Sequence, residues 1–184
     1  MSETGPHIVV TPPGPCARAI LERETRFVSP SLTKAYPLVV DHAKGAHVFD
    51  VDGNCYLDFT TGIAVTNLGH CHDRINAAIR DQLERLIHMS NADFTHPEYS
   101  ALCERLALLA PGNTPKKVFL SNSGTEAVEC AVKLAQHYFH GQRPHSLAFY
   151  GAFHGRTSGS LAYTASSPRQ RQWFKVIDGV EHIP

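Results

Sequence analysis

The stretch 116-KKVFLSNSGTEAVECAVK-133 decides the fold of this chain. Its apolar residues predict a short strand at 116–120, and the Ser-Gly-Thr turn that follows opens a long helix extending to about Phe139. A second short strand is predicted at 146–150. The order strand, helix, strand is typical of a parallel α/β layer.

The turn at the start of this helix has the features of a phosphate site. The first N–H groups of a helix lack intrahelical acceptors and lie at the positive end of its dipole. Gly124 lets an anion approach the backbone, and the hydroxyls of Ser123 and Thr125 add donors. Ser123 and Glu126 also have the spacing of a capping box. An ordinary capped helix is therefore the stronger interpretation of this segment taken alone.

The loop 151-GAFHGRTSG-159 is a second candidate. It follows the predicted strand at 146–150, and ligands of α/β sheets bind at the carboxyl ends of strands. Phe153 offers a flat apolar face for a ring, and Arg156 offers a planar fork for a carboxylate. His154 is either a general base or a hydrogen-bonded structural histidine. The alternative for the whole loop is a surface turn with a buried Phe and a solvated Arg.

The first half of the chain predicts a different organisation. Residues 1–15 are rich in Pro and Gly and predict an extended arm. The apolar runs and the Lys-Gly and Asp-Gly turns between them predict a small antiparallel sheet. Helices are predicted at 16–28, 72–89 and 97–110, and strands at 38–42, 46–51 and 55–59. The change of pattern divides the chain into a small N-terminal lobe, 1–70, and the beginning of a larger α/β domain, 71–184.

Composition excludes several classes of function. Basic and acidic side chains number 17 each, which gives no electrostatic footprint for nucleic acid. No apolar run is long enough to span a membrane. The five cysteines are an odd number without a C-x-x-C pair, which indicates reduced thiols in the cytoplasm. His70, Cys71 and His72 are adjacent and lack a second cluster, so a structural turn is a better interpretation than a metal site.

Three blocks of the sequence, taken in series, resemble the class III aminotransferases of pyridoxal-phosphate fold type I. They are 45-GAHVFDVDGNCYLDFTTGIAVTNLGHCH-72, 111-PGNTPKKVFLSNSGTEAVECAVKLA-135 and 148-AFYGAFHGRTSGSLAYT-164. The resemblance runs from about Gly5 to Pro184 and implies the N-terminal part of that α/β fold. The segment 37–53 is most similar to 4-aminobutyrate and related ω-amino-acid aminotransferases, with acetylornithine and ornithine aminotransferases as close relatives.

The resemblance implies roles for the residues that match the family's motifs. Pyridoxal 5'-phosphate would be the cofactor, and Phe153 would stack on its ring. A substrate carboxylate would bind Arg156, and Ile63 would line the substrate pocket. The residues implied to bind the cofactor are Ser123, Gly124, Thr125, Phe153 and His154.

The expected reaction moves an amino group from an ω-amino acid to an oxo acid such as 2-oxoglutarate, in a full-length form that is a homodimer. The family's Schiff-base lysine is expected beyond the end of this chain, so no catalytic residue is assigned, and we expect the 184-residue chain to be inactive and to fold poorly alone. Three alternatives stay open: a non-catalytic remnant or partner subunit, an acetylornithine or ornithine aminotransferase, and a related racemase or aminomutase.

Overall fold

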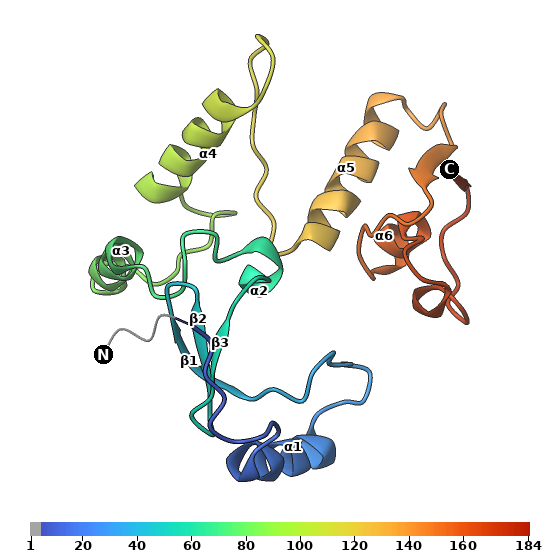
Figure 1. The fold of residues 1–184 in the computed structure, drawn as a ribbon. Helices are drawn as coiled ribbons and strands as arrows, with labels where there is room; N and C mark the ends of the chain where they lie inside the picture. Colours follow the sequence, from blue (N-terminus) through green and yellow to red (C-terminus); the bar gives the residue numbers. More distant parts are fainter. Residues whose placement is uncertain (1–4) are drawn as a thin grey trace. The chain divides into compact units, whose positions relative to one another are not determined.

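A computed structural model describes residues 5–184 (Figure 1). The chain divides into two compact units, of which the first ends at Ser90 and the second runs from Asn91 to Pro184. The predicted boundary after residue 70, between the two lobes of the complete fold, remains a prediction.

The first unit is built on a three-stranded antiparallel sheet. Its strands are β1 (Val40–Lys44), β2 (His47–Asp50) and β3 (Cys55–Leu57), in the order β1-β2-β3. The turns between them contain Gly45 and Gly53, whose φ angles are +58° and +87°, in the region that favours glycine. The predicted small antiparallel sheet is confirmed.

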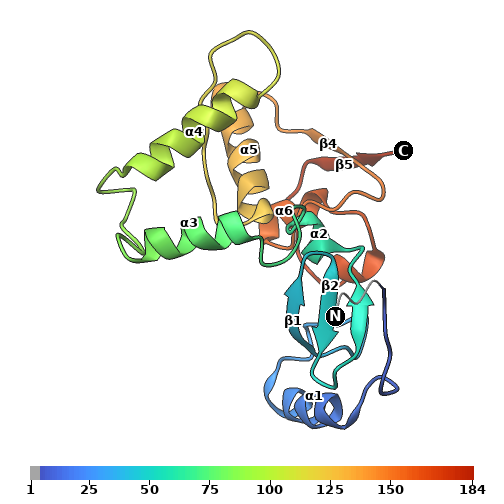
Figure 2. The same ribbon diagram turned by 60° about the vertical axis from the view of Figure 1, so that its left-hand side comes forward.

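Helix α1 (Pro15–Phe27) lies at one end of this sheet in both ribbon views (Figures 1 and 2). The carboxylate of Asp52, from the turn between β2 and β3, accepts hydrogen bonds from the N–H groups of Cys16 at 2.8 Å and Ala17 at 2.9 Å. It therefore supplies the N-terminal cap that Gly14 cannot provide. This contact fastens α1 to the sheet.

The centre of the first unit is polar. The Asn54 side chain is fully buried, and its Oδ1 accepts from the N–H groups of Val9 at 2.8 Å and Val10 at 2.9 Å. Its Nδ2 donates to the buried carboxylate of Asp50 at 2.7 Å. Burial acts to raise the pKa of Asp50, but hydrogen bonds, with those from Asn54 and Tyr56 foremost, hold it below its usual value. This network joins the N-terminal arm to the sheet.

Helix α3 (Asp73–Leu83) is shorter than the predicted 72–89. Residues 84–90 continue as turn and irregular chain, so the C-terminal part of that prediction is wrong. Helical stability comes mainly from packing of the apolar face, and Ile87 is 82% exposed. The side chain of Gln82 instead donates to the carbonyl of Leu86 at 2.9 Å, beyond the helix end.

The second unit combines helices with one pair of parallel strands (Figure 2). β4 (Ser146–Phe149) and β5 (Val180–Ile183) pair in parallel, and α6 (Ser158–Tyr163) lies in the connection between them. The predicted parallel layer is therefore confirmed for this pair. The remaining elements are α4 (Pro97–Leu109), α5 (Gly124–Tyr138) and the 3-10 helix η1 (Pro168–Gln170).

The strand predicted at 116–120 is wrong for the described structure. Residues 115–120 have no regular secondary structure, since β4 and β5 pair only with each other in this part of the chain. A strand needs a neighbour to form its hydrogen-bonded ladder. The apolar pattern predicted the strand, but it could not supply that neighbour.

A small core joins the helices and strands of the second unit. Ala148 of β4 packs with Ala162 and Tyr163 of α6, and all three are buried. The Tyr163 hydroxyl donates to Ser146 Oγ at 3.0 Å. This packing fixes α6, and with it the loop that precedes it.

Candidate functional site

The first turn of α5 is open on the side of Gly124. The N-cap hydroxyl of Ser123 accepts from the N–H of Glu126 at 3.4 Å, while the Glu126 carboxylate accepts from the N–H of Asn122 at 2.7 Å. The N–H groups of Gly124 and Thr125 have no acceptor within a helix. A Cβ built on Gly124 would meet no atom within 4 Å. An anion can therefore reach this turn without displacing protein atoms.

The loop 151–159 packs onto the same turn. Gly155 has a φ of +128°, which favours glycine. A Cβ built there would collide with Thr125 Oγ1 and would lie 2.5 Å from Ser160 Oγ. The absence of a side chain at Gly155 is thus what allows the loop to approach α5. The two candidate segments of the sequence lie together in the second unit.

Three hydroxyls form a cluster where these segments meet. Thr125 Oγ1 lies 2.5 Å from Ser160 Oγ and 3.0 Å from Thr157 Oγ1, and the Thr157 and Ser160 hydroxyl oxygens are 2.7 Å apart. Glu129, one turn along α5, accepts from the Thr157 hydroxyl at 2.5 Å. Its Oε1 also accepts from the N–H groups of Gly159 at 3.1 Å and Ser160 at 3.0 Å. We call Thr125, Glu129, Thr157 and Ser160 the hydroxyl clamp.

The electrostatics of the clamp favour a charged Glu129. The hydrogen bond from Thr157 lowers the pKa of Glu129, burial opposes it, and the N–H groups of Ser160 and Gly159 lower the pKa further. The net pKa lies below the usual value for a glutamate. Glu129 is therefore a carboxylate at neutral pH, and a carboxylate only accepts hydrogen bonds.

Phe153 and Arg156 lie next to each other on the loop. The Phe153 side chain is 56% exposed, and the guanidinium carbon of Arg156 is 5.9 Å from the centroid of its ring. The predicted burial of Phe153 in the non-functional alternative is therefore wrong. An exposed aromatic face beside a charged planar fork suits a ring that carries anionic substituents.

His154 is fastened to α6. Its N–H donates to the hydroxyl of Thr164 at 3.0 Å, and its ring stands edge-on to that of Tyr163 with centroids 6.3 Å apart. Thr164 in turn donates to the carbonyl of Gly155 at 2.8 Å. These contacts favour the structural interpretation of His154, and its role toward a cofactor remains a prediction.

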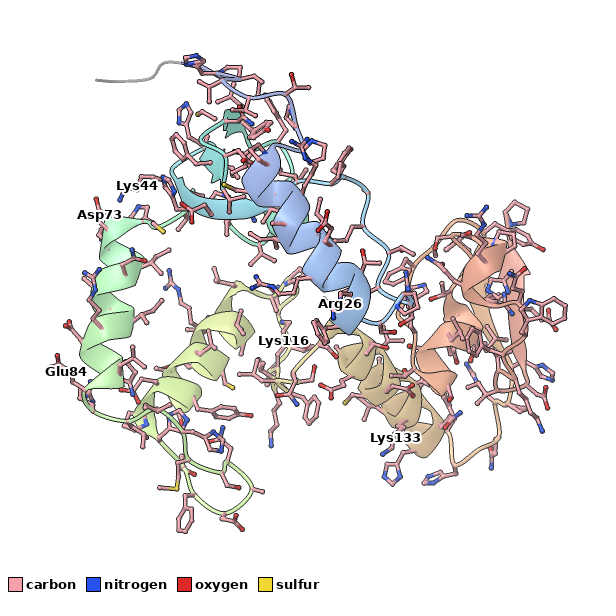
Figure 3. The ribbon with its side chains drawn as sticks, turned by 90° about the horizontal axis from the view of Figure 1, so that it is seen from below. Arg26, Lys44, Asp73, Glu84, Lys116 and Lys133 are labelled. Carbon is pink, nitrogen blue, oxygen red and sulfur yellow. The ribbon has the colours of Figure 1, made fainter. Side chains whose placement is uncertain are left out.

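Lys116 and Lys133 lie near or on α5. Lys116 donates to the carbonyls of Gly112 at 2.7 Å and Thr114 at 2.9 Å, in the turn that precedes the helix. Lys133 lies on α5 itself, more than two helical turns beyond Thr125 (Figure 3).

Ile63 lies in the first unit, in the four-residue element α2 (Thr61–Ala64), whose backbone is in the left-handed conformation. Its φ is +61°, that of Thr61 is +48°, and the Ile63 side chain is 93% exposed. Asp58 holds this element by accepting from the N–H groups of Thr60 at 2.7 Å and Thr61 at 2.9 Å and from His70 Nε2 at 2.7 Å. The bond from His70 is the main reason that the pKa of Asp58 lies far below its usual value. Lining of a substrate pocket by Ile63 remains a prediction.

The turn that contains His70, Cys71 and His72 is held by hydrogen bonds to the sheet. Gly45 and His70 exchange two backbone hydrogen bonds, and the Lys44 ammonium donates to Asp73 at the start of α3 (Figure 3). Within residues 5–184, no group of three or more His, Cys, Asp and Glu side chains is placed to hold a metal ion. Over the same residues, no helix is both long and apolar enough to cross a membrane.

Sequence reasoning missed Glu129, Thr157 and Ser160. Two signals were available. Thr125 and Glu129 are four residues apart and so share a helix face, and Thr157 and Ser160 have capping-box spacing, in which the N–H of Thr157 donates to Ser160 Oγ at 3.2 Å. What the sequence could not provide is the close packing that brings these two pairs together.

Comparison with known proteins identifies the family. The model of the family "Aminotransferase class-III" matches residues 28–184. The chain belongs to the class-III aminotransferase family.

Relatives in this family differ in their reactions. The isoleucine 2-epimerase of Lentilactobacillus buchneri is 37% identical over 170 residues, which cover 91% of this chain. The acetylornithine aminotransferase of Methanopyrus kandleri is 42% identical over 149 residues, or 81% of the chain, and the 4-aminobutyrate aminotransferase of Mycobacterium tuberculosis is 38% identical over 167 residues, or 91%. The chain spans 37% of the length of each of these curated relatives.

A solved structure confirms the expected fold. The ornithine aminotransferase of Toxoplasma gondii, in which pyridoxal phosphate partly occupies the active site, superimposes with a TM-score of 0.81. The match has 26% sequence identity and covers 91% of this chain and 39% of that one. The fold is thus that of part of a pyridoxal-phosphate-dependent transaminase.

The residues present fit the family's cofactor. Its phosphate needs clustered N–H donors and room beside them, and the open backbone at Gly124 and Thr125 supplies both. Its ring needs a flat apolar face, and the exposed side of Phe153 supplies one. The hydroxyl clamp holds these two features in one unit.

Proposed function

We propose that this chain is part of a pyridoxal-phosphate-dependent aminotransferase, and that the cofactor phosphate binds at the start of α5. The supporting observation is the close packing of Gly155 on Thr125, which brings the open helix terminus and the aromatic loop together. In the proposed site, the N–H groups of Gly124 and Thr125 hold the phosphate, Ser123 borders it, and Phe153 stacks on the ring. The cofactor, when bound, supplies an electron sink for cleavage of bonds at the amino carbon.

The proposed substrates are an ω-amino acid such as 4-aminobutyrate and an oxo acid such as 2-oxoglutarate. Arg156 would orient these molecules by binding a carboxylate through its two parallel N–H donors. We also propose that Ile63 lines a substrate pocket. The family membership and the relatives that are 4-aminobutyrate and acetylornithine aminotransferases support transfer of an amino group. We propose that the full-length protein acts as a homodimer in the cytoplasm.

Phosphate recognition can be tested by comparing pyridoxamine 5'-phosphate with pyridoxamine in titration calorimetry on the full-length protein. Neither compound has an aldehyde, so neither reacts with surface lysines. We expect the phosphorylated compound to bind at least about a hundredfold more tightly, a difference of about 3 kcal/mol. Equal affinities would contradict the proposal.

The variant Gly124→Val places a side chain in the open space where the phosphate would approach. Because no protein atom lies within 4 Å of the new Cβ, the fold should tolerate it. We expect the preference for the phosphorylated compound to fall about tenfold or more. A matched control is Glu104→Gln on the exposed side of α4, which should leave both affinities unchanged.

A second candidate function is amino-acid epimerisation or racemisation. It is favoured by the isoleucine 2-epimerase, which aligns over 91% of this chain. Product analysis on the full-length protein separates the two reactions. Formation of glutamate from 2-oxoglutarate supports transfer, whereas inversion of an amino acid without any oxo acid supports epimerisation.

A further inference from the structure

Glu129 is a half-buried carboxylate whose hydrogen bonds the proposed reaction does not explain. It lies one turn beyond the proposed phosphate site, on the same face of α5 as Thr125. One of its oxygens, Oε1, accepts three hydrogen bonds, from the Thr157 hydroxyl and from the N–H groups of Gly159 and Ser160. A Cβ built on Gly159 would collide with this carboxylate. A side chain at position 159 would therefore require the Glu129 carboxylate to move.

The protons of the hydroxyl clamp can be assigned from this arrangement. Because Glu129 only accepts, Thr157 must donate its single hydroxyl proton to it, and the Thr157 oxygen is then left to accept. Thr125 and Ser160 contribute one hydroxyl proton each. One proton is needed between these two oxygens, 2.5 Å apart, and the other can be donated to the Thr157 hydroxyl or, from Ser160, to the Thr157 carbonyl at 3.5 Å.

It follows that the Thr125 hydroxyl is committed within the protein. In the proposed site, Thr125 would contribute to phosphate binding through its backbone N–H, because its hydroxyl already has partners in the clamp. The clamp instead orders the loop. Thr157, held by Glu129, is directly bonded to Arg156 in the chain.

We propose that Glu129 is a positioning residue that sets the direction of Arg156 through Thr157 and so determines the affinity for the substrate carboxylate. This inference rests on the proposed function, because it takes Arg156 as the carboxylate-binding group. Glu129 itself touches neither substrate nor cofactor in this account. Removing the Glu129 carboxylate should therefore weaken substrate binding and leave the affinity for the cofactor unchanged.

The test uses Glu129→Ala and Glu129→Gln in the full-length protein, with Glu104→Gln on α4 as the matched control. For Glu129→Ala we expect the KM for 2-oxoglutarate to rise about tenfold, since small displacements of a positioning group weaken binding strongly. We expect kcat and the affinity for pyridoxamine 5'-phosphate to change less than about twofold, because the start of α5 is intact. Glu129→Gln keeps an oxygen acceptor and should recover part of the loss.

An unchanged KM in Glu129→Ala would overturn the inference. A parallel loss of affinity for pyridoxamine 5'-phosphate would also overturn it, since Glu129 would then act on the cofactor site. Amide hydrogen exchange at Gly159 and Ser160 provides a readout that does not depend on activity. Glu129→Ala should accelerate it, and unchanged exchange refutes the positioning role. If Glu129→Ala accelerates exchange but the wild-type protein transfers no amino group, the proposed function is refuted and the positioning role is not.

Discussion

Gly155 is the position where the packing of the loop on α5 can be perturbed most directly. In Gly155→Ala the new methyl group would collide with Thr125 Oγ1 and crowd Ser160 Oγ at 2.5 Å. The backbone at this position also has a φ of +128°, which alanine adopts only under strain. The substitution therefore acts on the contact that joins the two halves of the proposed site.

The expected loss of stability in Gly155→Ala has two parts. A residue held in a sparsely populated backbone region costs about 1–3 kcal/mol, and overpacking of a close contact costs about 1–3 kcal/mol more. We expect a loss of about 3 kcal/mol in the free energy of unfolding of the second unit. Gly151→Ala is the matched control, because Gly151 also has a positive φ, +81°, but no atom lies within 4 Å of its added Cβ. That control should lose only about 1 kcal/mol.

The assay is hydrogen exchange of peptides from residues 124–164 across a urea titration of the full-length protein, which reports on this unit separately. Affinity for pyridoxamine 5'-phosphate is measured beside it. We expect Gly155→Ala to weaken this affinity about tenfold. Equal losses of stability in Gly155→Ala and Gly151→Ala would refute the reasoning, because backbone strain alone would then account for the effect.

Three further outcomes are expected. Asn54→Ala leaves the N–H groups of Val9 and Val10 without their acceptor and should destabilise the first unit by about 2 kcal/mol in urea unfolding. The hydrogen bond from His70 lowers the folded-state pKa of Asp58. The charged Asp58 therefore contributes its full stabilisation above the usual aspartate pKa, and this contribution is lost as the pH falls through the lowered pKa. Asp58→Asn should thus weaken the dependence of the free energy of unfolding on pH at acid pH. The 184-residue chain, incubated with pyridoxal 5'-phosphate, 4-aminobutyrate and 2-oxoglutarate, should form no glutamate at an enzyme-like rate.

Local chemistry made much of the fold predictable. The Asp52-Gly53 turn indicated the hairpin, and the turn at Ser123 indicated where α5 begins. Both features depend on the backbone preferences of a few neighbouring residues, so they can be predicted from the sequence. The strand predicted at 116–120 failed because a strand depends on a neighbour elsewhere in the chain.

The candidate site was predictable only in part. Gly124, Phe153 and Arg156 stand out because their side chains, or the lack of one, match the chemistry of a phosphate, a ring and a carboxylate. Glu129 was not predicted, because its place in the clamp depends on three hydrogen-bond donors from a loop distant in the sequence. The need for glycine at position 155 was not predicted for the same reason, because it comes from close packing against Thr125 on another element.

The most direct test of the account is hydrogen exchange of the full-length protein with pyridoxamine 5'-phosphate and, separately, with pyridoxamine. If the start of α5 binds the phosphate, the phosphorylated compound will protect the backbone amides of Gly124 and Thr125, and the compound without phosphate will not. Protection that is equal for both compounds, or that leaves these two amides unchanged, would contradict it.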